Sequence, residues 1–360
     1  MEQLPHFQTF RSQTINSQII NSQTINSLGI DGVLSPTCHY RISDQDLLKG
    51  YEIMTLTRLV DERMITLQRQ GLISFALSSF GEEACAVASA AALNFCDWMY
   101  PQYREPGVMF YRGWSIQEYI HQMFCNSHDL NLGHQMPNHF GAKSLNVVTV
   151  SSTIATQIPH AAGCAYAMKL QGEKSVAIAY FGDGGTSEGD FHAGLNFAAV
   201  RKVPAIFFCR NNGYAISTPV SKQFASDGVA PKGIGYGIAT FRVDGNDYYA
   251  VHEITAKAKG LCLEGKGPVL IEAMTYRRGA HSTSDDPSLY RKETEVKEWE
   301  AKCPILRLKR HLMIKGLWDD KQDAAMIEKI SQEISLSIDV AKAAPAPPLQ
   351  SLFEHVYFQS

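Results

Sequence analysis

The stretch from Ser175 to Asn212 constrains the fold of this chain more than any other part of its sequence. Two apolar runs, Val176–Phe181 and Pro204–Cys209, enclose a segment with helical periodicity that follows the glycine turn Gly182–Gly185. This order predicts a strand, a turn, a crossover helix and a second strand. Because both runs are continuously apolar rather than alternating, we expect parallel strands that helices cover on both faces.

The same alternation of strands and helices continues beyond this stretch. We expect buried strands at Thr240–Val243 and Val269–Met274 with a helix at Tyr248–Leu263 between them, and a short strand at Val147–Val150. A capping-box pattern opens a long amphipathic helix over residues 43–71. The predicted fold class is therefore α/β, a single domain with a mostly parallel sheet and helices on both faces.

Composition divides the chain into three parts. We expect a polar, disordered or extended tail at residues 1–40, the α/β domain at residues 41–300, and a helical C-terminal region and tail at residues 301–360. The N-terminal tail carries a short repeat, SQTIN, SQIIN and SQTIN, over residues 12–26, and such polar low-complexity sequence favours disorder. A secretory signal is not expected, because the start lacks an apolar core, and a mitochondrial presequence would contain more arginine than the single Arg11.

The balance of charged and apolar residues argues against several classes of partner. The formal net charge is −3 over 360 residues with both signs interspersed, so we expect neither a nucleic acid nor an anionic membrane as a partner. No apolar run approaches the roughly 20 residues of a membrane span, which predicts a soluble protein. The eight cysteines are scattered without a CxxC pair, which is typical of reduced thiols in an intracellular protein.

Polar side chains follow the two strands of the opening stretch. Asp183 comes directly after the first apolar run and Asn212 after the second, and the carboxyl ends of parallel strands form the ligand-binding edge of open α/β sheets. One carboxylate, one amide oxygen and the backbone carbonyl of Tyr214 supply half of an octahedral Mg²⁺ shell. His128, His134 and His139 are too loosely spaced for us to expect a second metal site there.

The glycine turn beside this metal site is suited to a phosphate group. Gly182, Gly184 and Gly185 allow close approach to the backbone, the following helix offers free N–H groups, and Arg210 can add a charge-assisted hydrogen bond. The chain has no GxxxxGK[ST] sequence, and the turn lacks the GxGxxG spacing of dinucleotide-binding folds. The pattern therefore predicts a site for a metal-bridged diphosphate.

These residues carry a resemblance to a known family. Gly182-Asp183-Gly184, residues 185–210 and then Asn211-Asn212 are similar to the thiamine-diphosphate-binding motif. From about Ser43 to Tyr357 the chain resembles the alpha subunits of the E1 components of 2-oxo acid dehydrogenase complexes. The segments that resemble the branched-chain members rather than the pyruvate members are residues 73–75, 102–105, 151–152 with 155–159, 209–218 and 281–286.

The resemblance implies an oxidoreductase of branched-chain amino acid catabolism. Such an E1 binds Mg-thiamine diphosphate, decarboxylates branched-chain 2-oxo acids such as 3-methyl-2-oxobutanoate, and transfers the acyl group to a lipoyl-bearing E2 acyltransferase. The family's α2β2 heterotetramer takes the glutamate that protonates the pyrimidine ring from the beta subunit, so this chain alone should be inactive. The expected location is the cytoplasm of a bacterium, or the mitochondrial matrix if the source is eukaryotic.

The resemblance also assigns roles to single residues. It gives Mg²⁺ to Asp183, Asn212 and the Tyr214 carbonyl, with Asp183 standing where the animal branched-chain members have Glu. The residues expected to contact the cofactor are Tyr103, Arg104, Ser152, Ile154, Gly182, Asp183, Gly184, Gly185, Arg210, Asn212 and His281. A potassium ion is expected at Ser151, Thr156 and Gln157.

His281 is the expected catalytic residue. It would assist acylation of the lipoyl group by proton transfer or charge stabilisation, because imidazole titrates near the working pH. The neighbouring Ser282 corresponds to a serine that is phosphorylated in mitochondrial members, and a loop-stabilising hydroxyl is the alternative. The family pattern has Pro at Thr153 and a second His at Ala280, so the geometry of both loops departs from it.

Two alternative functions remain open from the sequence. The chain could be the E1 alpha subunit of a pyruvate or acetoin dehydrogenase, which differs mainly in pocket residues. From another class, it could be a noncatalytic thiamine-diphosphate-binding paralogue. A paralogue of that kind predicts lesions at Asp183, Asn212, Arg210 or His281, and all four residues are intact.

Overall fold

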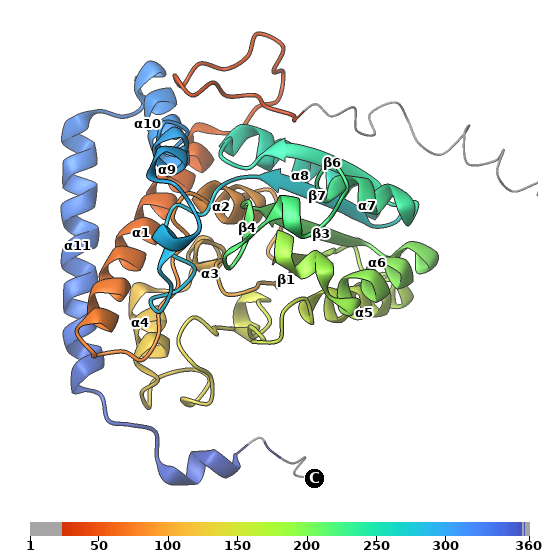
Figure 1. Ribbon diagram of the computed structural model, residues 1–360. Coiled ribbons are helices and arrows are strands. Elements are labelled where there is room, and N and C mark those ends of the chain that lie inside the picture. Colours follow the sequence, from red (N-terminus) through yellow and green to blue (C-terminus); the bar gives the residue numbers. More distant parts are fainter. Residues whose placement is uncertain (1–23, 355, 357–360) are drawn as a thin grey trace, which may run out of the picture.

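The computed structural model describes residues 24–354 and 356 (Figure 1). A five-stranded sheet with the order β1-β2-β3-β7-β6 forms its centre, and every neighbouring pair is parallel. The strands are β1 (Trp98–Tyr100), β2 (Ala177–Gly182), β3 (Ala205–Asn211), β6 (Ala239–Asp244) and β7 (Val269–Met274). The predicted α/β class with a mostly parallel sheet is confirmed.

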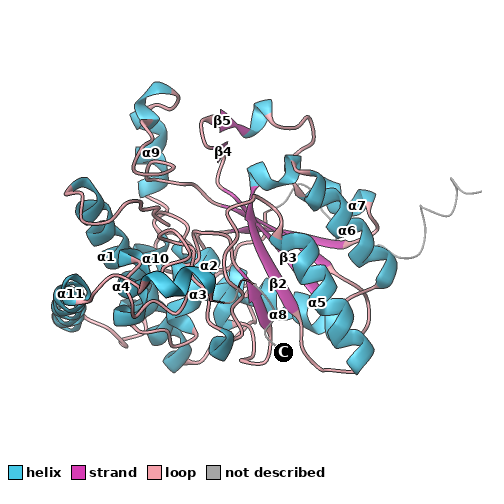
Figure 2. Ribbon diagram, turned by 90° about the horizontal axis from the view of Figure 1, so that it is seen from below, coloured by secondary structure: helices cyan, strands magenta, loops and turns pink. Residues whose placement is uncertain are grey.

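Helices cover both faces of this sheet (Figure 2). The α-helices of the described residues are α1 (Asp44–Arg69), α2 (Glu83–Ala91), α3 (Pro106–Tyr111), α4 (Ile116–Phe124), α5 (Gln157–Gln171), α6 (Gly189–Arg201), α7 (Ala230–Gly235), α8 (Tyr248–Leu263), α9 (Glu293–Glu300), α10 (Pro304–Ile314) and α11 (Asp320–Ala343). Along β2, Ile178 and Tyr180 join the apolar cluster that contains α2 and α8, whereas Ala179 and Phe181 join the cluster that contains α5 and α6. Both faces of β2 are therefore buried, which explains its continuously apolar sequence.

Three local predictions differ from the structure or were missing. The predicted strand Val147–Val150 forms only isolated bridges, in which Val147 pairs with Met99 and Ala142. Strand β1 was not predicted, because three residues are too few to show a period. The segment 213–237, whose glycines and Pro231 favour irregular structure, contains the short hairpin of β4 (Tyr214–Ala215) and β5 (Thr218–Pro219) as well as α7.

The predicted long helix is confirmed as α1. Ser43 caps it, because its hydroxyl accepts a hydrogen bond from the Asp46 N–H at 3.1 Å. Helix α1 packs against α10 and α11, and α11 runs alongside it in Figure 1. The apolar residues of α10 and α11, among them Leu308 and Ile334, belong to the same buried cluster as α1, so the described part of region 301–360 shares the core of the α/β domain.

Residues 24–28, here called the N-terminal strap, cover the outer edge of β6 (red in Figure 1). Ile25 pairs in parallel with this strand, donating its N–H to the Arg242 carbonyl at 3.0 Å and accepting from the Asp244 N–H at 2.9 Å. The N–H groups of Ser27 and Leu28 both donate to Asp247, at 2.6 and 2.7 Å. Residues 24–26 of the third copy of the repeat thus protect an edge strand. Residues 1–23, which contain the first two copies and the start of the third, lie outside the described residues.

Replacing Leu28 with Ala should destabilise the protein by about 2–5 kcal/mol, because it empties a fully enclosed site in the core. Leu28 is 1% exposed. Ile30 is 51% exposed two residues later, and Ile30→Ala should change the stability by less than about 0.5 kcal/mol. Urea unfolding followed by circular dichroism measures both variants. Equal effects of the two substitutions would show that the strap does not contribute to the core.

No helix within the described residues is long and apolar enough to cross a membrane.

Candidate functional site

A cavity of about 300 Å³ opens at the carboxyl ends of β2 and β3, and we call it the central cavity. It is lined by Gln102, Tyr103, Arg104, Ile154, Gly182, Asp183, Gly184, Gly185, Glu188, Arg210, Asn212, Tyr214, Ala215, Ile216, Arg277 and His281. Every residue predicted to contact the cofactor or Mg²⁺ is in this set except Ser152. The structure therefore brings these predicted residues together in one cavity at the strand ends, and their roles stay a prediction.

Asp183 and Asn212 lie next to each other in the central cavity. Asp183 is buried, and its carboxylate accepts hydrogen bonds from the Asn212 N–H at 3.2 Å and from the Gln223 amide at 2.7 Å. Burial raises the pKa of this carboxyl group above its ordinary value. A bound cation would favour the ionised form, because it replaces part of the lost hydration.

Three oxygen atoms form the candidate metal site. They are the Asp183 carboxylate, the Asn212 side-chain Oδ1 and the Tyr214 carbonyl. The Oδ1 of Asn212 accepts from the Tyr214 N–H at 3.2 Å, and the Tyr214 carbonyl accepts from Arg277 Nη1 at 3.4 Å. Hard oxygen donors of this kind suit Mg²⁺, so these residues fit the predicted ion.

The glycine turn fits a phosphate group. A Cβ atom added at Gly182 would find no neighbour closer than the Arg210 carbonyl at 4.0 Å, so this position faces open space in the cavity. A Cβ atom at Gly184 would come within 2.7 Å of the Ala215 Cβ, which only glycine avoids. The backbone is therefore accessible to a ligand at the predicted position.

Arg210 is held between two buried carboxylates. Its Nη1 pairs with Glu82 and its Nε with Glu105, and all three side chains are at most 2% exposed. Burial lowers the pKa of Arg210, but the carboxylates of Glu105 and Glu82 outweigh burial and hold the pKa above its ordinary value. The guanidinium is charged and fixed at the wall of the central cavity.

Several residues at this site were not predicted from the sequence. Glu82, Glu105 and Gln223 hold the predicted residues, while Gln102, Glu188, Ala215, Ile216 and Arg277 line the cavity directly. Arg277 follows the end of β7 as Asn212 follows β3, so the strand-end rule could have identified it. Glu82 has no such signal, because nothing in its spacing relates it to a strand end.

His281 lies on a loop beside two arginines. Its Nδ1 is 3.1 Å from Arg104 Nη2 and 3.4 Å from Arg277 Nη1, and its backbone N–H donates to Asp285 at 2.7 Å. Burial, followed by Arg104 and Arg277, lowers the pKa of His281 to about 3. The prediction from the sequence that the His281 imidazole titrates near the working pH is therefore wrong. The ring is neutral, its Nδ1 accepts a hydrogen bond, and its Nε2 carries the proton.

Comparison with known proteins identifies the family. The family model described as "Dehydrogenase E1 component" matches residues 51–350. The chain belongs to the dehydrogenase E1 component family. This E1 component is 47% identical over 330 residues to "2-oxoisovalerate dehydrogenase subunit alpha, mitochondrial" of Dictyostelium discoideum, covering 91% of this chain and 75% of the relative.

Other relatives show the same degree of similarity. The human protein of the same name is 46% identical over 326 residues, which covers 90% of this chain and 73% of the human one. The protein named "2-oxoisovalerate dehydrogenase subunit alpha 2, mitochondrial" of Arabidopsis thaliana is 46% identical over 318 residues, which covers 88% of this chain and 67% of the relative. The resemblance to E1 components is thus confirmed, and all residues that line the central cavity lie within the matched region.

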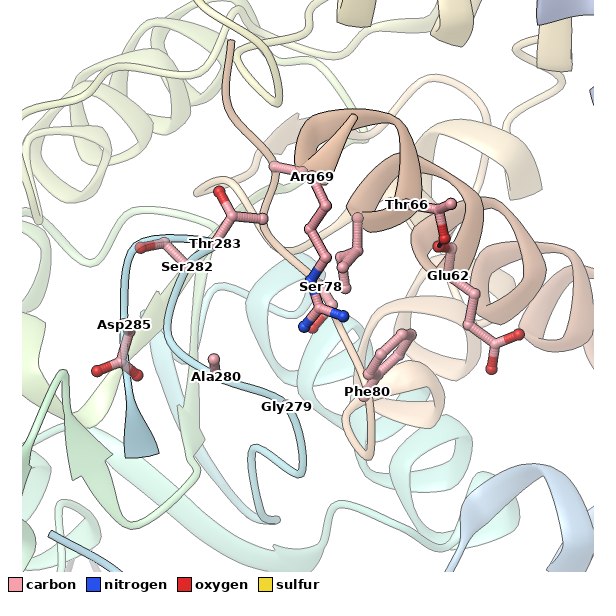
Figure 3. A pocket seen from close by; sticks show the side chains of 12 residues that line it. Glu62, Thr66, Arg69, Ser78, Phe80, Gly279, Ala280, Ser282, Thr283 and Asp285 are labelled. Atoms are coloured by element: carbon pink, nitrogen blue, oxygen red, sulfur yellow. Dashed lines mark hydrogen bonds between the residues drawn. The ribbon is translucent and has the colours of Figure 1, made fainter. Parts of the chain in front are cut away.

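A second cavity of about 420 Å³ borders the loop of residues 279–285 (Figure 3). It is lined by Glu62, Ile65, Thr66, Arg69, Ala76, Ser78, Phe80, Gly279, Ala280, Ser282, Thr283 and Asp285. Although it is larger, none of the residues predicted for the cofactor lines it. Arg104 lies between the two cavities, because its guanidinium donates to the carbonyls of Ser78 and His281, both at 2.5 Å.

The turn before α5 holds the other predicted residues of this E1 component. Ser152 lies outside the lining of the central cavity, where its hydroxyl contacts His139 Nε2 at 2.7 Å. Gln157 donates to the Tyr180 carbonyl at 2.7 Å. In the described part of the chain, no hydrogen bond joins the side chains of Ser151, Thr156 and Gln157, and the potassium site stays a prediction. Residues 24–354 and 356 contain no group of three His, Cys, Asp or Glu side chains that could hold a metal ion.

Proposed function

We propose that this chain is the alpha subunit of a branched-chain 2-oxo acid dehydrogenase E1, a lipoamide-transferring oxidoreductase that uses Mg-thiamine diphosphate. The observation that carries the proposal is the meeting of Asp183, Asn212 and the glycine turn in one cavity of a chain whose relatives are named 2-oxoisovalerate dehydrogenase subunit alpha. Those relatives are named mitochondrial. We propose the mitochondrial matrix as the location in a eukaryotic source and the cytoplasm in a bacterial one.

The residues of the central cavity would hold the two ends of a metal-bridged diphosphate. Asp183, Asn212 and the Tyr214 carbonyl would bind Mg²⁺, and Gly182–Gly185 together with Arg210 would contact the phosphate oxygens. Tyr103, Arg104, Ile154 and His281 border the same space. Thiamine diphosphate, when bound, supplies the electron sink that allows a 2-oxo acid to lose CO₂.

This chain would supply half of an active site. The residues described here form one five-stranded parallel sheet and one short hairpin, which accounts for a single diphosphate-type domain. The glutamate that acts on the pyrimidine ring would then come from a beta subunit in an α2β2 heterotetramer. The acyl group would pass to a lipoyl-bearing E2.

His281 would act as a hydrogen-bond donor. Because Arg104 occupies its Nδ1, the Nε2–H group is the one left for a ligand. A neutral imidazole is a poor proton donor but a good hydrogen-bond donor to developing negative charge. It would therefore stabilise charge on the reacting atoms during acyl transfer to the lipoyl sulfur, and this is the narrower of the two roles expected from the sequence.

An assay of substrate preference tests the proposal. The chain is assembled with its beta subunit and E2, and kcat/KM is measured for 3-methyl-2-oxobutanoate and for pyruvate. We expect a preference of at least about 10-fold for the branched substrate, because a pocket gains that much from extra methyl groups. A preference for pyruvate or acetoin would identify the other E1 class. If neither substrate is turned over although the beta subunit is functional, the chain would be a noncatalytic paralogue.

A further inference from the structure

Glu82 contacts two residues of the central cavity without lining the cavity itself. It precedes α2 and is 1% exposed. One carboxylate oxygen, Oε1, accepts from the Asn212 side-chain amide at 2.9 Å, and the other, Oε2, pairs with Arg210 Nη1. One buried carboxylate therefore holds both a candidate metal ligand and a candidate phosphate ligand.

The contact with Asn212 decides which end of its amide is free. An asparagine side chain has one oxygen, which can bind a metal, and one NH₂ group, which cannot. Glu82 binds the NH₂ group, and the only hydrogen bond to Oδ1 within the described residues is the one from the Tyr214 N–H at 3.2 Å. One lone pair of Oδ1 is then left for a cation, so Glu82 selects the orientation that a metal ligand requires.

The contact with Arg210 limits where its guanidinium can point. Glu105 pairs with Nε and Glu82 with Nη1, and no hydrogen bond from Nη2 to a carboxylate is found among the described residues. Because the guanidinium is planar, two fixed nitrogens also fix the third. The direction in which Arg210 can donate to a ligand thus depends on Glu82.

We propose that Glu82 is a positioning residue that orients Asn212 toward the metal and Arg210 toward the diphosphate. The inference rests on the proposed function, because it assigns a role relative to Mg-thiamine diphosphate. It predicts that loss of Glu82 weakens the response to Mg²⁺ specifically, beyond any loss of stability. Outer residues that hold metal ligands typically change metal affinity by about 10- to 100-fold when replaced.

Glu83 offers a matched control. It is the next residue, it is 0% exposed, and it pairs with Arg58 and accepts from the Gly81 N–H at 3.0 Å. None of these partners lines the central cavity. Glu82→Gln and Glu83→Gln therefore both disturb a buried ion pair, but only the first disturbs Asn212 and Arg210. A glutamine at position 82 has one oxygen and one NH₂ group, so it cannot accept from both partners.

The experiment measures cofactor binding in the assembled αβ enzyme. Binding of thiamine diphosphate is followed by isothermal titration calorimetry at a series of Mg²⁺ concentrations. We expect Glu82→Gln to raise the Mg²⁺ concentration for half-saturation by about 10- to 100-fold and Glu83→Gln to change it by less than about 3-fold. Thermal unfolding without cofactor reports the stability of each variant separately.

The outcomes separate the inference from the proposed function. Wild-type protein that binds the cofactor, with equal Mg²⁺ responses in both variants, would overturn the role of Glu82 and leave the function intact. A wild-type assembly that binds no Mg-thiamine diphosphate would overturn both. If Glu82→Gln does not fold, Glu82→Asp replaces it. The shorter carboxylate keeps the charge but cannot reach both partners, so a wild-type Mg²⁺ response in that variant would also reject the inference.

Discussion

Replacing Asp183 with Ala is expected to reduce turnover of the assembled enzyme by at least about 100-fold, the upper end of the loss seen when groups that merely support a metal ligand are removed. Asp183 is the only charged member of the three-oxygen metal site and is almost completely buried, so water cannot take over its role freely. Steady-state turnover and the Mg²⁺ dependence of cofactor binding measure the effect.

Glu188 provides the control for this substitution. It lines the same cavity and carries the same charge, but it lies exposed at the start of α6. Glu188→Ala should alter turnover by less than about 3-fold, because an exposed charge interacts weakly across water. If Asp183→Ala kept a wild-type response to Mg²⁺, Asp183 would not be a metal ligand.

The second large effect concerns His281. Substitution by Ala should slow acylation of the lipoyl group by about 100-fold or more, in the range of a lost group that assists the transition state. The affinity for the cofactor should change much less, because Arg104 and Arg210 remain in place. Rapid-quench measurement of lipoyl acylation and calorimetric binding separate the two effects. Ser284→Ala, an exposed change on the same loop, serves as the control.

The lowered pKa of His281 adds a dependence on pH. The unfolded chain takes up a proton at this residue near pH 6.5, whereas the folded protein does so only near pH 3. Stability contributed by this site therefore falls as the pH drops from about 6.5 toward 3. His281→Asn should lose less stability than wild type between pH 7 and 5, and urea unfolding at both pH values measures this. Equal losses would mean that the ring is protonated in the folded protein.

The predictable parts of the fold are those whose structure leaves a clear local pattern in the sequence. Strands β2, β3 and β7 are buried on both faces, and burial leaves a continuous apolar run in the sequence. Strand β1 has three residues, and Val147 joins the structure through isolated bridges only, so neither has a period that could be recognised. The position of the cavity was predictable because Asp183 and Asn212 follow the ends of two strands. This rule of topology needs no knowledge of side-chain contacts.

The residues that hold the cavity side chains in place could not be predicted from the sequence. Glu82 contacts Arg210 across 128 positions of sequence, and Arg104 contacts His281 across 177. Such contacts depend on how complete layers of the fold pack, and no local pattern encodes them. Burial and then the distant Arg104 lower the pKa of His281, with a further contribution from the nearby Arg277, so its chemistry could only be inferred once the loops were placed.

The N-terminal strap also determines which copy of the repeat can occupy the edge of β6. All three copies are followed by serine, but the next residue is Gln18 after the first, Gln23 after the second and Leu28 after the third. A shift of the chain by ten residues would therefore preserve the sequence Thr-Ile-Asn-Ser, and a shift by five would change only Thr24 to Ile. Either shift would place a glutamine amide in the buried site of Leu28. Burying an unpaired amide costs about 1–3 kcal/mol, so one side chain outside the repeat discriminates among otherwise interchangeable alignments.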